Sequence, residues 1–230
     1  MSLYKRKIRL KAEHVDCFRK LRLGALMTMF QECCIAHTEE LGMGRKMTLD
    51  KGLLWVINSE SIQIDRLPEY DEEITLLCRP GKTMHFFFPR QFEVIDEKGN
   101  TIIKIGALWS LIDIKMRKMI DPSEHGIVID GENREGDVAP LMFIPPKPLE
   151  NKVQIKAKYS LVDINGHMNN ASYLEFAQDL LEPKELLKIK RVDIVFRKEL
   201  PLGNTALLSY GKDENKYEFY CENFSMIFTF

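Results

Sequence analysis

The spacing at which apolar residues repeat changes along the chain, and each change marks the start of another predicted element. Residues 4–11 alternate between apolar and charged side chains, which is typical of a strand. Residues 23–37 repeat apolar side chains at helical spacing until Gly42 and Gly44 interrupt it, which predicts a long helix. Because this helix is apolar around most of its circumference, we expect other elements to surround it.

The rest of the first half has the pattern of strands. Segments rich in Val, Ile and aromatic residues predict strands over residues 53–66, 73–79, 84–95 and 101–114, with a hairpin turn at residues 96–100. Asp121-Pro122 ends this pattern. Residues 140–151 hold four of the ten prolines, which indicates a linker between two domains.

After the linker the pattern starts again. A strand is predicted over residues 153–161. A helix is predicted to begin near Asn169, with a capping box formed by Ser172 and Glu175, and to be stopped by Pro183. Residues 188–200 and the remainder of the chain again predict strands.

The two halves match each other, which indicates an internal repeat. An offset of 147 residues places Val15-Asp16 on Val162-Asp163, and an offset of 133 places Pro68 on Pro201. The repeated order is a strand, an apolar helix and a run of antiparallel strands, and a sheet curled around one long central helix satisfies it. The predicted fold is therefore α+β, with two such units in domains 1–139 and 152–230, a linker at 140–151 and the sheets paired side by side.

Composition narrows the class of protein but is silent on function. The 230 residues carry 33 Lys and Arg against 34 Asp and Glu, a balance that gives no sign of a nucleic-acid partner. Five cysteines, an odd number without a C-x-x-C pair, argue against a disulfide framework and a cysteine zinc site. We find no apolar signal segment and no run close to the about 20 apolar residues of a membrane span, so we expect a cytoplasmic protein without a membrane partner.

Polar residues concentrate where the second half is expected to pass from strand to helix. Asp163, Asn165 and His167 are spaced by two, so an extended backbone would place all three side chains on one side. The helix after Asn169 would direct free N–H groups and the positive end of its dipole to the same region, which suits negative charge developing on a carbonyl oxygen. A simpler interpretation, a turn with a helix N-cap, stays open.

The repeat favours the chemical interpretation. In the first half the matching residues are Asp16, Phe18 and Lys20, so the Asn and the His occur in the second copy only. A turn needed only for structure would have less reason to differ between copies. We therefore expect the second and smaller unit to carry all of the chemistry.

Further motifs follow one another in the order of a known family. The first is D-x-N-x-H-x-N-N at residues 163–170, with Tyr173 in the helix after it, and the second is Phe196-Arg197-Lys198-Glu199. The first half adds Leu54-Trp55-Val56, Asp65-Arg66-x-Pro68, Arg90, Ala107-x-Trp109 and Arg117-Lys118-Met119. Together these motifs resemble the acyl-acyl carrier protein thioesterases of the plant and bacterial type, which have tandem hot-dog folds.

The resemblance implies a double hot-dog enzyme that hydrolyses the thioester between a fatty acyl chain and acyl carrier protein, which releases free fatty acid and ends fatty acid synthesis. The implied partner is acyl carrier protein with its phosphopantetheine-linked acyl chain, and no metal or cofactor is implied. The catalytic set it implies is Asp163, Asn165, His167 and Glu199. The acyl pocket is expected in the N-terminal half, against Met27, Phe30 and Trp55.

One departure from the family bears on the mechanism. Many relatives carry Cys directly after the Glu, where this chain has Leu200, so a cysteine nucleophile does not apply at this site. We expect Glu199 or Asp163 either to activate a water or to attack the thioester carbonyl, while His167 orients that carboxylate or relays the proton. Asn165 and the amides at the helix start would hold the oxyanion.

Two other functions stay open at this point. A hot-dog thioesterase acting on acyl-CoA would have the same fold, and a non-catalytic acyl-binding module would bind without turnover. Two hot dogs in one chain already supply the pairing that single ones reach by dimerising, so a monomer and a homodimer both fit. Basic clusters at residues 5–7, 19–22 and 115–118 are interpreted as solvated faces. Docking of the acidic carrier protein on one of them is the alternative that stays open.

Overall fold

One antiparallel sheet forms the frame of the molecule in the computed structural model, which describes residues 2–230. Its strands are β1 (Tyr4–Arg9), β2 (Leu53–Ile64), β3 (Glu73–Pro80), β4 (Phe87–Ile95), β5 (Thr101–Asp113), β6 (Asn151–Lys156), β7 (Arg191–Phe196), β8 (Thr205–Asp213), β9 (Lys216–Tyr220) and β10 (Phe224–Thr229). Their order across the ten-stranded sheet is β1-β3-β4-β5-β2-β7-β10-β9-β8-β6.

The strand order repeats about the middle of the sheet. From one edge it runs β1-β3-β4-β5-β2, and from the other edge it runs β6-β8-β9-β10-β7, which is the same order for each half. The halves join where β2 pairs antiparallel with β7, with Ser59 opposite Val195 and Gln63 opposite Arg191. The prediction of an α+β double hot-dog with its two sheets side by side is confirmed.

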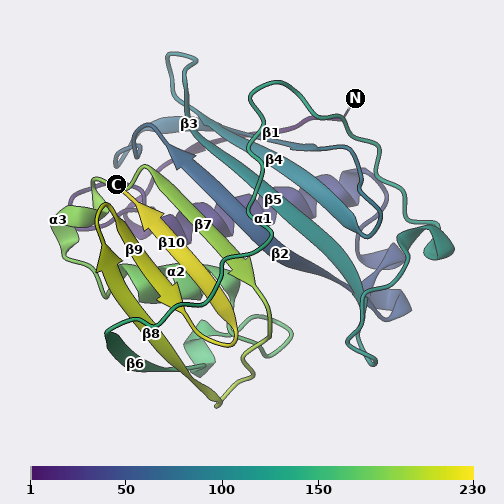
Figure 1. Cartoon of the computed structure of the whole chain (residues 1–230). Coiled ribbons are helices and arrows are strands. Elements are labelled where there is room, and N and C mark those ends of the chain that lie inside the picture. The colour runs from purple at the N-terminus through teal and green to yellow at the C-terminus, as the bar shows by residue number, and fades with distance from the viewer. Residues whose placement is uncertain (1) are drawn as a thin grey trace.

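Helices cover one face of this sheet. The long apolar helix is α1 (Leu23–Glu40), and the second half has α2 (Asn170–Gln178) and the short α3 (Pro183–Leu186). Figure 1 shows α1 and α2 behind the sheet. The two approach each other at Gly24, where a β-carbon would stand 2.3 Å from Glu175 Cγ unless that side chain moved. Short 3-10 helices occupy turns at Ala12–His14, Arg45–Met47, Leu49–Lys51, Pro122–His125 and Tyr159–Leu161.

The main core lies between the sheet and these helices and includes residues of both halves. Phe30 of α1, Leu174 of α2 and Phe219 of β9 are all fully buried in it. Burial of a side chain of this size contributes roughly 1.5–3 kcal/mol. A smaller cluster, which includes Leu53 and Phe88, continues the apolar layer at the end of β2 and β4.

The connection from β5 to β6 crosses the opposite face of the sheet, in front of the strands in Figure 1. Val138 is held there by the Gln91 side chain, which accepts from its N–H at 3.0 Å and donates to its carbonyl at 2.9 Å. A β-carbon on Gly106 would stand 1.8 Å from the Val138 carbonyl oxygen, so this approach of two backbones requires glycine. Residues 126–150 form no helix or strand, and the division into domains 1–139 and 152–230 stays a prediction.

Two predicted boundaries in the second half are wrong. The strand predicted over residues 153–161 ends at Lys156, and the 3-10 helix Tyr159–Leu161 follows it. Pro183 does not stop a helix; it occupies the first turn of α3. Its fixed φ suits that position, and its missing N–H would have no partner within the helix there.

The second offset of the repeat is wrong by one residue. Leu21 N donates to the Pro68 carbonyl at 2.9 Å, and the matching bond of the second half runs from Met168 N to the Leu200 carbonyl at 2.8 Å. Pro68 therefore corresponds to Leu200 and not to Pro201. The offset of 147 holds before α1 and α2, where the first and last 3-10 helices correspond residue by residue.

Candidate active site

A tight turn, not an extended segment, carries the three spaced polar residues. Asp163 N donates to the His167 carbonyl oxygen at 2.8 Å and closes the turn. The Asp163 carboxylate accepts from the backbone N–H of Asn165 at 2.8 Å and of His167 at 3.2 Å. Gly166 takes a φ of +76°, which glycine adopts at little steric cost. The turn therefore fixes the place of His167 at the start of the segment that leads into α2.

The chain after β7 brings Glu199 to the same place. His167 forms an isolated backbone bridge with Pro201, two residues beyond Glu199. Asn223, between β9 and β10, donates from its side-chain amide to the carbonyl of Glu199 and to the preceding carbonyl, both at 3.1 Å. Because Asn223 is itself buried, the backbone that carries Glu199 has a rigid support.

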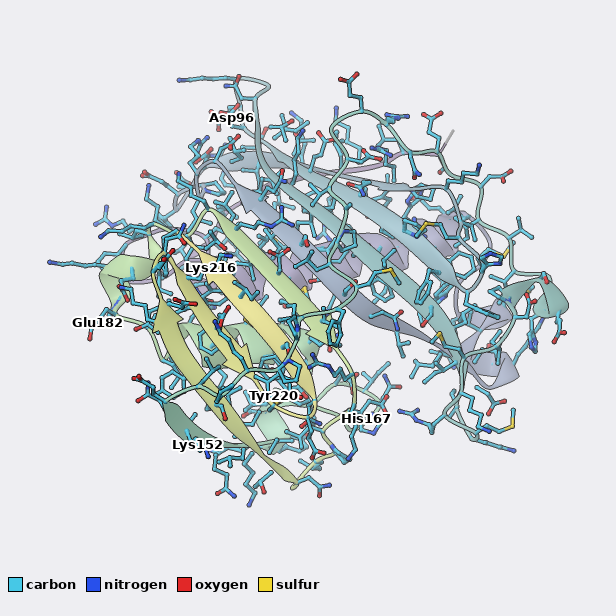
Figure 2. All side chains as sticks on the ribbon, viewed as in Figure 1. Asp96, Lys152, His167, Glu182, Lys216 and Tyr220 are labelled. Carbon is cyan, nitrogen blue, oxygen red and sulfur yellow. The ribbon has the colours of Figure 1, made fainter. Side chains whose placement is uncertain are left out.

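His167 and Glu199 face each other across this bridge. His167 Nδ1 lies 3.5 Å from Glu199 Oε1, and Glu199 Oε2 pairs with the guanidinium of Arg117. A separation of 3.5 Å exceeds that of a good hydrogen bond, and such pairs commonly tighten when substrate binds. The His167 side chain is 23% exposed and that of Glu199 37%, so a substrate can reach both. Figure 2 shows His167 near the lower end of the sheet.

Arg117 comes from the first half of the chain. The turn after β5 presents it: Asp113 Oδ1 accepts from Lys115 N at 2.8 Å and from Met116 N at 2.7 Å, and Arg117 takes a φ of +53°. The interpretation of this basic cluster as a solvated face is wrong for Arg117, and the candidate site is not confined to the second half. No sequence spacing links Arg117 with Glu199, because the pair exists only when the two halves join.

The environment of His167 keeps its ring neutral over more of the pH range than usual. Burial lowers the pKa of His167, the positive charge of Arg117 lowers it further, and the negative charge of Asp163 opposes both. Its Nδ1 is buried without a hydrogen-bond partner, so Nε2 is the ring nitrogen left for a water or a substrate. A neutral imidazole at this place can accept a proton.

The other two predicted residues pair with each other. Asn165 Nδ2 donates to Asp163 Oδ2 at 3.1 Å, so the structure brings the four predicted residues together as two pairs. At the start of α2, Asn169 and not the predicted box at Ser172 caps the helix: its side chain accepts from the second N–H of the helix at 2.9 Å.

A surface pocket of about 300 Å³ opens beside Glu199, and its walls include Pro201 and Asn223. The residues predicted to line an acyl pocket lie elsewhere, on the helix-covered face of the first half. Met27 and Phe30 are fully buried in the main core, and Trp55 packs edge to face on Phe88 with ring centroids 4.9 Å apart.

Residues 2–230 contain no disulfide, no metal-binding cluster and no membrane-spanning helix. The five cysteines are free thiols, and of these only Cys17 is exposed. Over the same residues, no group of three or more His, Cys, Asp or Glu side chains is arranged to hold a metal ion. No helix in the described part of the chain has both the length and the apolar character needed to span a bilayer.

Solved structures share this fold along the whole chain. An acyl-ACP thioesterase from Bacteroides thetaiotaomicron superposes with a TM-score of 0.83 at 23% identity, covering 100% of this chain and 99% of that one. A 12:0-ACP thioesterase from Umbellularia californica gives a TM-score of 0.81 at 15% identity, covering 99% and 96%. At these identities the likeness shows the fold.

Sequence comparison identifies the family. A chloroplastic acyl-acyl-carrier-protein hydrolase from Cuphea viscosissima is 19% identical over 204 residues, which cover 80% of this chain and 48% of that protein. The chain thus spans about half the length of this curated relative. The family model for the acyl-ACP thioesterase N-terminal domain matches residues 1–125, and the model for the C-terminal domain matches residues 146–224. The chain therefore belongs to the acyl-ACP thioesterase family.

Proposed function

We propose that this protein hydrolyses the thioester that joins a fatty acyl chain to the phosphopantetheine of acyl carrier protein, releasing the free fatty acid. The observation that carries the proposal is the partly exposed pair of His167 and Glu199, with Nδ1 and Oε1 3.5 Å apart. Family membership supports the substrate class. We assign Asp163, Asn165, His167 and Glu199 to the site, with Arg117 as the partner that positions Glu199.

In this proposal the pair activates a water. The water adds to the carbonyl carbon while its proton passes to His167 Nε2, and Glu199 faces the Nδ1 side of the ring. The C–S bond then breaks, and the thiolate leaves and takes up the proton. With a thiol pKa of roughly 8.5, the leaving group needs little acid assistance. Direct attack by Glu199 would instead form a mixed anhydride and expel the thiolate. When water then adds to the Glu199 carboxyl carbon, one Glu199 oxygen leaves with the fatty acid and the oxygen of the water stays in Glu199.

The test is hydrolysis of acyl carrier protein thioesters from C8 to C18, next to acyl-CoA thioesters of the same chains. We expect kcat/KM to be higher on the carrier-protein thioesters than on the CoA thioesters. We expect His167→Ala and Glu199→Gln each to abolish most of the turnover. Equal or better turnover of the CoA thioesters would make the protein an acyl-CoA thioesterase. Tight binding of acyl chains without turnover by the wild-type protein would make it an acyl-binding module.

Single-turnover hydrolysis in ¹⁸O-labelled water separates the two chemical routes. Activation of water places the label in the released fatty acid and leaves the protein unlabelled. Label in Glu199 or Asp163 would contradict that route and favour covalent attack. A cytoplasmic location and a monomeric or homodimeric state complete the proposal, and fractionation of cells and light scattering test them.

A further inference from the structure

Glu60 is an anomaly in the apolar layer between the sheet and α1. The side chain is completely buried, and neither carboxylate oxygen has a hydrogen-bond partner. Burial raises the pKa of Glu60 well above its ordinary range, which favours the neutral carboxylic acid. A buried polar group without a partner destabilises the fold by about 1–3 kcal/mol, and native proteins keep few of them.

The surroundings offer Glu60 no ionic partner. In the sheet, Arg90 and Glu60 lie on either side of Ala107, two strands apart. Arg90 turns away, because its guanidinium contacts His37 Nδ1 at 3.0 Å and donates to Thr38 Oγ1 at 2.8 Å. The side chain of Ala107 is small, so it fills little of the layer beside Glu60.

Other buried polar atoms without a partner lie between Glu60 and the candidate active site. They are Trp109 Nε1, Asn58 Oδ1 and Trp55 Nε1. Trp109 packs on Phe30 of α1 with ring centroids 6.4 Å apart, which places it in the same layer as Glu60. Asn58 sits at the bulge of β2, where the register with β5 shifts. The two indole N–H groups thus interrupt the apolar layer on the side of Glu60 that leads to the start of β2.

That direction leads from the candidate active site into the first half. Glu60 is paired with Ile194 of β7, and Glu199 follows Ile194 by five residues, beyond the end of that strand. At about 3.3 Å per extended residue, the separation is at most roughly 16 Å. A chain that enters beside Glu199 and follows the inner face of β2 would therefore bring its distal part to Glu60.

We propose that the protein takes acyl chains carrying a hydroxyl group in their distal part, and that Glu60 is the residue that recognises this hydroxyl. The assignment rests on the proposed thioesterase function and narrows its substrate class. A neutral carboxylic acid donates one hydrogen bond and accepts another, and a hydroxyl group can complete both. A plain methylene chain leaves both oxygens of Glu60 without a partner, so a site of this kind binds it less well.

The experiment compares kcat/KM for carrier-protein thioesters of equal length, unsubstituted or hydroxylated at successive positions. We expect the wild-type protein to favour one distal hydroxyl position at least about tenfold, and Glu60→Leu to lose that preference. Glu60→Gln keeps a donor and an acceptor and should retain part of it. Ser59→Ala is the matched control, because Ser59 is also buried with an unpartnered oxygen but points to the other face of β2.

Three results would overturn the assignment. They are equal kcat/KM for plain and hydroxylated chains in the wild-type protein, an unchanged preference in Glu60→Leu, and a change in Glu60→Leu that concerns chain length alone. Calorimetry with non-hydrolysable thioether analogues, on the wild-type protein and Glu60→Gln, gives the same comparison without turnover. If the analogues bind with the hydroxyl preference but no thioester is hydrolysed, the thioesterase proposal fails and the role of Glu60 stands.

Discussion

The turn before α1 and the turn before α2 are built in the same way. Asp16 N donates to the Lys20 carbonyl at 2.9 Å, as Asp163 N does to the His167 carbonyl at 2.8 Å. The Asp16 carboxylate accepts from two backbone N–H groups of its own turn, both at 2.9 Å. Each turn has one residue with positive φ, Arg19 in the first and Gly166 in the second.

The side chains displayed on these two turns differ. Lys20 pairs with Glu69 at 2.5 Å on the surface, whereas His167 faces Glu199 and is partly buried. Phe18, with its apolar side chain, stands where the second turn has Asn165. The aspartate is thus a scaffold that both halves share, and the candidate chemistry depends on what the second turn adds to it.

The largest difference in kcat is expected between substitutions of His167 and of Lys20, which occupy the same position in the two turns. His167→Ala should lower kcat by about two to four orders of magnitude, because it removes the proton acceptor. Lys20→Ala, the matched change in the first turn, should leave kcat close to that of the wild type. Steady-state kinetics on one acyl carrier protein thioester measures both. Equal activity of the two variants would remove His167 from the site.

The next largest difference in kcat is expected between substitutions of Asp16 and Asp163, the aspartates that the two turns share. Asp16→Ala and Asp163→Ala each remove an acceptor of two backbone N–H groups, and each should lower the free energy of unfolding by about 1 kcal/mol. Only Asp163→Ala should also lower kcat, by about a hundredfold, because it displaces His167. Urea unfolding and kinetics on both variants test this. A similar loss of kcat in Asp16→Ala would mean that the turns act through overall stability.

The pH dependence of kcat extends the comparison to Arg117, since within residues 2–230 no ion pair joins the first turn to the other half. Activity requires neutral His167, so it is lost as the pH falls through the pKa of His167. The charge of Arg117 lowers that pKa. Arg117→Gln should therefore raise it and move the acidic limb of the kcat profile to higher pH, with kcat at pH 8 reduced only severalfold.

Arg117→Lys is the matched control for that experiment. It keeps the positive charge, so the acidic limb should stay near its wild-type position even if Glu199 is less well oriented. An acidic limb that does not move in Arg117→Gln would show that the limb belongs to a group other than His167.

Much of the fold could be predicted from the sequence because its signals are local. The apolar repeat of residues 23–37 predicts α1, and the Asp of each turn appears at an offset of 147. Arg117 could not be assigned, because its contact with Glu199 depends on how β2 and β7 pair. Glu60 could not be assigned either: the bulge at Asn58 decides which residues of β2 face the helices, and alternation alone does not locate a bulge.

The smallest difference is expected in the free energy of unfolding, at the residue with positive φ in each turn, Arg19 and Gly166. Gly166→Ala should lower the free energy of unfolding by about 1 kcal/mol, because a β-carbon is unfavourable at that φ although no atom lies within 4 Å of it. Arg19→Gly should raise it by less than about 0.5 kcal/mol, since relief of strain is offset by the freer unfolded chain. Urea unfolding measures both. Since neither Arg19 nor Gly166 contributes a side chain to the site, kcat should stay near the wild-type value. A large loss of kcat in Gly166→Ala would mean that the backbone at Gly166 must move during turnover.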